Sequence, residues 1–64
     1  MNDKFIKIAD VMNRTTLGRS SIYKYIKLGL FPKAVTSIGK SNVWVEREIQ
    51  EWIQERIKAR DTAS

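Results

Sequence analysis

The 64-residue chain contains no cysteine and no histidine. Without cysteine, no disulfide can close the fold and no thiolate can bind zinc. Without histidine, the chain lacks the usual general base and the commonest protein ligand of transition metals. These absences argue against an enzyme and against a metalloprotein. We therefore expect no catalytic residue, no metal site, no cofactor and no small-molecule substrate.

Long hydrophobic runs are also missing. No stretch approaches the roughly 20 apolar residues that a membrane-spanning helix needs, and the first ten residues, MNDKFIKIAD, lack the apolar run of a signal peptide. We expect no membrane partner and a cytoplasmic location. The length predicts one domain, residues 1–64, with a small core.

Positive charge is abundant and unevenly distributed. The net charge is +5, and the chain up to Asn42 holds eight basic residues against two acidic ones. From Val43 on, four basic residues stand against five acidic ones. The excess in the first two-thirds favours a polyanion partner, although ordinary solubilising charge is the alternative.

The stretch GRSSIYKYIKLG, residues 18–29, predicts a short helix with two different faces. Ile22 and Ile26 lie one turn apart and indicate a buried face. Gly18 suits the N-cap, and Gly29 suits a left-handed residue that ends the helix before Pro32. The opposite face carries hydrogen-bond donors, two of them cationic: Ser20, Tyr23, Lys24 and Lys27. It is either a DNA recognition surface or a solvated helix face.

Further elements are predicted on both sides of this helix. Residues 5–8 favour a short strand, and residues 8–14 have helical spacing. Residues 34–38 and 43–45 predict a β-hairpin around a turn at 39–42, and residues 45–60 predict the last helix before a frayed end at 61–64. The expected core residues are Ile8, Val11, Ile22, Ile26, Leu30, Ile49, Trp52 and Ile53.

Two short helices joined by about four residues are typical of a helix-turn-helix, and the hairpin would supply a wing. The predicted fold is therefore mainly α with a small β-hairpin, a winged helix-turn-helix. Three blocks of sequence also resemble the AlpA family of phage and prophage regulators. They are residues 19–24 (RSSIYK), residues 29–33 (GLFPK), and residues 43–46 (VWVE) leading to Ile49 and residues 51–53 (EWI).

The resemblance covers nearly the whole chain. AlpA-like proteins are winged helix-turn-helix proteins related to MerR-type DNA-binding domains and to small excisionases. The resemblance implies a sequence-specific regulator of mobile-element genes, often an integrase gene, or an excisionase that shapes DNA for recombination. The family usually has glycine in the interhelix turn and serine at the cap, where this chain has Thr16 and Gly18. A positive φ at Thr16 would strain a β-branched residue.

The predicted partner is double-stranded DNA, with the second helix in the major groove. Ser20, Tyr23 and Lys24 are expected at base edges or nearby phosphates, and Arg19 at a phosphate or a base. Lys27, Lys33 and Lys40 are expected at phosphates, which position the protein without reading sequence. The whole predicted set is Arg19, Ser20, Ser21, Tyr23, Lys24, Lys27, Lys33, Lys40, Ser41 and Asn42.

Other functions are weighed against this one. An enzyme would have to use Ser20 or Ser21 without a histidine. A protein-interaction module, such as an anti-repressor, would use Tyr23 or Phe31 as exposed aromatics. RNA binding is less favoured, because no strand carries a row of stacking aromatics.

Neighbouring copies on DNA are a further expected partner. We expect glutamates on the outer face of the last helix to meet the Lys4 and Lys7 side chains of an adjacent copy. These glutamates are Glu48, Glu51 and Glu55.

Overall fold

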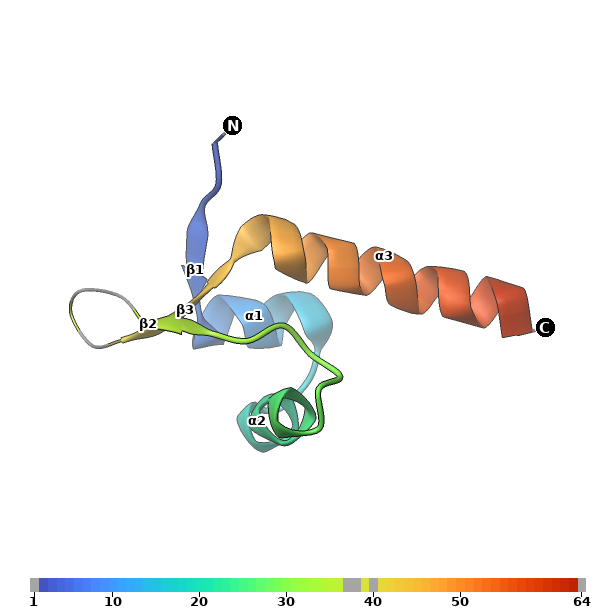
Figure 1. Cartoon of the computed structure of the whole chain (residues 1–64), viewed down its shortest axis with the longest axis horizontal. Coiled ribbons are helices and arrows are strands. Elements are labelled where there is room, and N and C mark those ends of the chain that lie inside the picture. Colours follow the sequence, from blue (N-terminus) through green and yellow to red (C-terminus); the bar gives the residue numbers. More distant parts are fainter. Residues whose placement is uncertain (1, 37–38, 40, 64) are drawn as a thin grey trace.

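The computed structural model of the chain describes residues 2–36, 39 and 41–63. Among these residues, three helices surround a small antiparallel sheet (Figure 1). The elements follow the order β1 (Phe5–Lys7), α1 (Ile8–Thr15), α2 (Arg19–Lys27), β2 (Val35–Thr36), β3 (Asn42–Val45) and α3 (Glu46–Ala63). Helices α1 and α2 form the helix-turn-helix, and β2 with β3 forms the wing. The predicted winged helix-turn-helix is confirmed.

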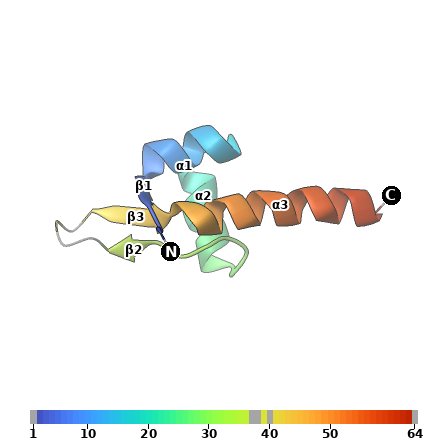
Figure 2. The ribbon, with the colours of Figure 1, turned by 90° about the horizontal axis from the view of Figure 1, so that it is seen from above.

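Strand β3 is the centre of the sheet, between β1 and β2. Ile6 of β1 lies opposite Trp44, and Val35 of β2 lies opposite Val43. The predicted N-terminal strand therefore extends the wing hairpin into a three-stranded sheet. Figure 2 shows α1 on one side of α3 and β2 on the other, with α2 beneath.

The core is built around the fully buried indole of Trp44. It packs in one cluster with Ile6, Val11, Ile22, Phe31 and Ile49. Of the expected core residues, Val11, Ile22 and Ile49 are fully buried. Four others are partly buried against the same cluster: Ile8, Ile26, Trp52 and Ile53.

The expectation that Leu30 is a core residue is wrong, because its side chain is 61% exposed and Phe31 is buried in its place. The indole nitrogen of Trp52 donates to the Leu30 carbonyl at 2.8 Å, and that of Trp44 donates to the Pro32 carbonyl at 3.1 Å. These bonds hold the backbone so that the Phe31 ring packs edge-on against Trp52, with centroids 4.8 Å apart. Phe31 is therefore not the exposed aromatic expected for a protein-interaction module.

The end of α2 follows the prediction. Gly29 has a φ of +76°. Its N–H donates to the Ile26 carbonyl at 3.0 Å, and the N–H of Leu30 donates to the Tyr25 carbonyl at 2.8 Å. This is the Schellman pattern that satisfies the last carbonyls of a helix.

The interhelix turn contains the strained residue that the sequence suggested. Thr16 has a φ of 62°, in the left-handed region, and its N–H donates to the Met12 carbonyl at 2.8 Å. The turn reverses the chain between α1 and α2, so this backbone conformation is required although the residue is β-branched.

Helix α3 is longer than predicted. It begins at Glu46, since Val45 belongs to β3, and it continues through Ala63. The expectation of a frayed end is wrong for residues 61–63, where Thr62 Oγ1 donates to the Lys58 carbonyl at 2.7 Å. Ser64 lies outside the described residues. In the described part of the chain, no helix is both long enough and apolar enough to cross a bilayer.

The wing differs from the prediction in its bounds. Strand β2 contains only Val35–Thr36, and Asn42 belongs to β3 instead of the turn. Ala34 of the predicted strand is not part of β2, and residues 37–38 lie outside the described residues.

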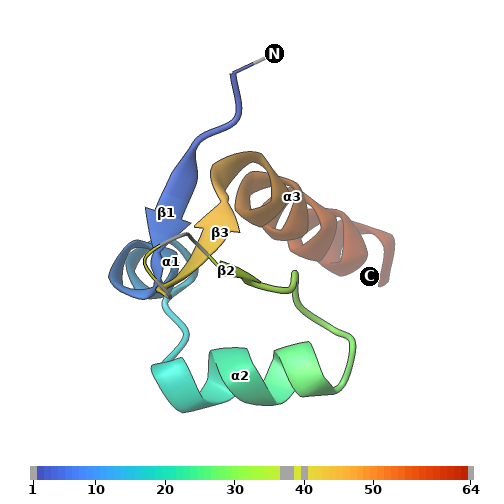
Figure 3. The same ribbon diagram turned by 60° about the vertical axis from the view of Figure 1, so that its left-hand side comes forward.

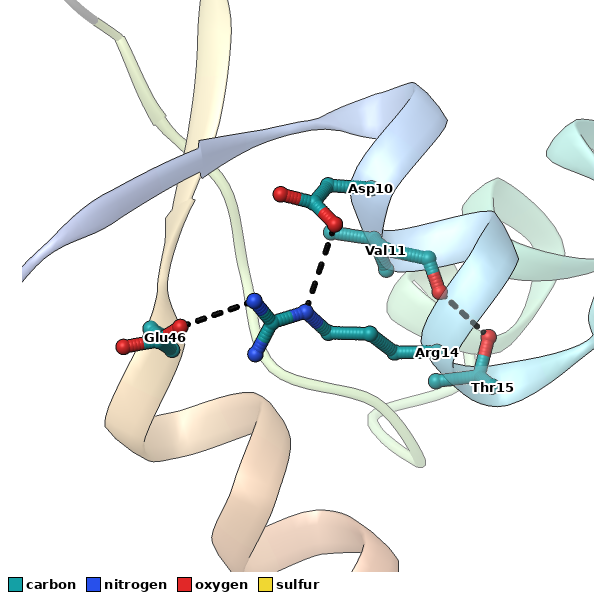
Figure 4. A network of polar contacts seen from close by, with 5 residues as sticks. All are labelled: Asp10, Val11, Arg14, Thr15 and Glu46. Atoms are coloured by element: carbon teal, nitrogen blue, oxygen red, sulfur yellow. Dashed lines mark hydrogen bonds and ion pairs between the residues drawn. The ribbon is translucent and has the colours of Figure 1, made fainter.

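An arginine network joins α1 to the start of α3 (Figure 4). Arg14 donates to Asp10 at 3.3 Å and contacts Glu46 at 2.8 Å. The hydrogen bonds with Asp10 and then Glu46 raise the pKa of Arg14. Arg47 similarly pairs with Asp3 at 2.9 Å, and this hydrogen bond lowers the pKa of Asp3. Both arginines thus serve the fold.

The two left-handed residues predict opposite effects of substitution. Thr16→Gly should stabilise the fold by about 1 kcal/mol, because glycine adopts a positive φ without the Cβ clash. Gly29→Ala should destabilise it by about 1 kcal/mol. A Cβ at position 29 meets nothing within 4 Å, so the backbone conformation alone accounts for the cost. Urea denaturation measures both, and shifts of the same sign would contradict the assignment of strain.

Candidate nucleic-acid interface

Helix α2 lies on one side of the molecule, below the sheet and α3, and its outer face is uncovered (Figures 1 and 3). Ile22 is fully buried and fixes the rotation of the helix about its own axis. Four of the predicted site residues are consequently exposed on the outer side: Ser20, Tyr23, Lys24 and Lys27. Arg19 is exposed in the first turn of the helix. Ser21 is half-buried at the edge of this face.

The part of the chain that the structure describes supplies no counter-charge to the cations of α2. Helix α2 contains no acidic residue. Within the described residues, no carboxylate forms an ion pair with Arg19, Lys24 or Lys27. Lys33, exposed in the connection from α2 to β2, is likewise without an ion pair there. In contrast, Arg14 and Arg47 are held by carboxylates, so the cations of α2 differ from those that join elements of the fold.

The wing is joined to α2 through Tyr23. The Asn42 side-chain amide donates to the Tyr23 hydroxyl at 3.4 Å. Behind this bond, the rings of Tyr23 and Trp44 lie 6.1 Å apart at 58°. Asn42 is exposed beside the helix, Ser41 is exposed one position before it, and Lys40 lies outside the described residues. Of the predicted wing residues, the structure therefore brings Asn42 to the same surface as α2.

The N-terminus of α2 is open. Gly18 occupies the N-cap with extended backbone, as predicted, and supplies no side-chain cap to the first turn. Amide groups in this position attract anions because the helix dipole reinforces them. The first turn contains no acidic residue that would compete for them.

The sequence did not reveal that Tyr23 has a partner in the wing. Tyr23 and Asn42 are 19 positions apart, and neither lies in a local motif that links a helix to a strand. The sequence predicts that Trp44 lies in a short strand, but it does not predict that the Trp44 indole contacts the Tyr23 ring. Among the described residues, no group of carboxylates is arranged to hold a metal ion.

Known proteins provide an independent comparison. The sequence profile of a family described as prophage CP4-57 regulatory protein (AlpA) matches residues 4–57. The chain is also 36% identical over 58 residues to the uncharacterized protein ORF88 of enterobacteria phage P4. That alignment covers 91% of the chain and 66% of ORF88, slightly less than two thirds of the relative's length. No solved structure matches the chain significantly.

Proposed function

The chain belongs to the AlpA family of prophage regulatory proteins, and we propose that it regulates phage or mobile-element genes by binding specific sites on double-stranded DNA. The observation that carries this proposal is the exposed face of α2 beside the wing, whose cations form no ion pair with any residue that the structure describes. Such a surface matches the arrangement by which winged helix-turn-helix proteins contact DNA. This proposed function involves no catalysis. We place the binding of DNA in the cytoplasm of the bacterial host.

The exposed side chains suggest a division of roles. Ser20 is exposed in the first turn of α2 and Lys24 one turn further along, and a lysine there can donate to the O6 and N7 atoms of guanine. Tyr23 also faces the groove, but its bond to Asn42 means that it positions the wing as well. Phosphate contacts are assigned to the cations around them and to the wing: Arg19, Lys27, Lys33, Lys40, Ser41 and Asn42. The half-buried Ser21 and the open amides of the first turn would hold a further phosphate.

An excisionase is the second candidate, because a single module of this kind has a small interface. One such module buries roughly 600–1,000 Å² of protein surface on DNA, which favours additional contacts between neighbouring copies. Glu51 and Glu55 are exposed on α3, and Lys4 and Lys7 are exposed at the N-terminal strand. A head-to-tail contact between these surfaces does not close, so it would produce a row along the duplex. A row of this kind can hold DNA in a bend.

The first test is a salt titration of the protein against labelled random-sequence duplex DNA. If the protein contacts four to six phosphates, the logarithm of the binding constant should fall with the logarithm of salt concentration with a slope of about −4 to −5. Fluorescence anisotropy measures the binding constant at each salt concentration. Binding that is absent, or that does not depend on salt, would refute the proposed function.

The second test separates sequence reading from phosphate contact. Lys33→Ala should weaken binding to all sequences alike and reduce the salt slope by about one. Lys24→Ala should additionally reduce discrimination between a sequence selected from a random pool and an unselected duplex, by about 1–3 kcal/mol. Competition binding measures this difference. If both variants lose affinity equally on the two duplexes, Lys24 does not read bases.

The third test concerns neighbouring copies. Wild-type protein should bind a long duplex with a Hill coefficient above one, and Glu51→Lys with Glu55→Lys should lower it without weakening binding at a single site. Gln50→Lys with Gln54→Lys adds half as much positive charge beside these glutamates and removes no carboxylate, so it should lower the coefficient less. Non-cooperative binding by the wild type, or an equal loss in the control, would contradict a row of copies.

A further inference from the structure

The C-terminal half of α3 projects beyond the rest of the molecule (Figures 1 and 2). Ile49 is fully buried and Trp52 and Ile53 are half-buried, whereas every residue from Gln54 to Ala63 is exposed. A helix of 18 residues is about 27 Å long, and the core covers only its first half. The projecting half therefore requires an explanation other than core packing.

Arg56 is the cation on the inner side of this projection. It follows Ile49 by seven positions and Ile53 by three, so it lies on the core-facing side of the helix. With Leu17, Tyr25, Leu30 and Trp52 it lines a cavity of about 350 Å³. Tyr25 belongs to α2 and Leu17 to the interhelix turn, so Arg56 lies near the helix-turn-helix and not on the outer surface of α3.

The charge of Arg56 is not compensated in the part of the chain that the structure describes. No carboxylate there forms an ion pair with it. An adjoining surface hollow is lined by Arg56 together with Arg14 and Arg60. Arg14 is paired with Asp10 and Glu46, and Arg60 is paired with Asp61, so Arg56 is the guanidinium of this hollow that suits an anionic partner.

The position of the projecting half of α3 relative to α2 indicates that the anionic partner of Arg56 is a DNA phosphate. In Figure 1, α2 is seen nearly end-on, with β2 and β3 on one side of it and the C-terminal half of α3 on the other. A helix in the major groove, which is about 12 Å wide, has a phosphate strand along each side. The wing would lie beside one strand and Arg56 beside the other.

We propose that Arg56 contacts a phosphate of the DNA strand on the side of α2 opposite the wing. This inference rests on the proposed DNA binding and extends the interface from α2 and the wing to α3. The projecting half of α3 thus becomes a second support for the duplex. The contact adds affinity and orientation, and it reads no base.

The experiment compares Arg56→Ala with Lys58→Ala on a labelled random-sequence duplex over a range of salt concentrations. Lys58 lies two positions further along the helix, beside Arg47 and Glu51 on the outer surface. Lys58→Ala therefore removes one positive charge, as Arg56→Ala does, but from the opposite face of α3. Arg56→Ala should reduce the magnitude of the salt slope by about 0.9 and weaken binding about eightfold at 0.1 M salt. Lys58→Ala should change the slope much less, and Arg56→Lys should retain most of it.

The results separate this inference from the proposed function. If the wild type binds DNA with a steep salt dependence but Arg56→Ala and Lys58→Ala have equal slopes, the Arg56 contact is refuted and DNA binding by α2 stands. Equal slopes are also the result expected if Arg56 binds an acidic protein segment instead of DNA. If the wild type does not bind duplex DNA, both proposals fail. Circular dichroism of each variant verifies that the fold is retained.

Discussion

Burial of the Trp44 indole is the interaction on which the other elements depend. Its ring fills the space between the sheet and the helices, and its N–H donates to the Pro32 carbonyl. Trp52 makes the equivalent bond to the Leu30 carbonyl. Together the two indoles hold the connection that leaves α2, and this connection fixes the end of α2 relative to the sheet. The N–H of the buried Trp44 needs an acceptor, so its bond to Pro32 favours one path for the backbone.

The position of α2 then determines which charges are available to a partner. Arg14 and Arg47 join elements of the fold through carboxylates, and their charge is largely compensated. Arg19, Lys24 and Lys27 are exposed on a helix without acidic residues, and Lys24 and Lys27 lie on the face opposite the buried Ile22. The molecule therefore keeps its structural ion pairs apart from the surface of α2, where the positive charge is not neutralised by the described residues. This separation, more than the net charge, favours a polyanion partner.

The bond between Asn42 and Tyr23 makes the wing and the helix parts of one surface. A wing that is attached only by its strands could vary in its angle to α2, and contacts made by the two parts would then be independent. The Tyr23 ring, supported by Trp44, limits that variation. The same buried tryptophan thus stabilises the core and contributes to the geometry of the proposed interface.

The sequence by itself determined the features that depend on neighbours along the chain. The spacing of Ile22 and Ile26, the Gly29 termination and the exposed cations of α2 follow from helical period and from turn chemistry. Only the tertiary structure decided which side of a short connection is buried, so Phe31 and not Leu30 packs in the core. It also decided that Tyr23 meets Asn42 and that Arg56 lies near α2. These contacts join residues far apart in the chain, and local patterns carry no information about such distances.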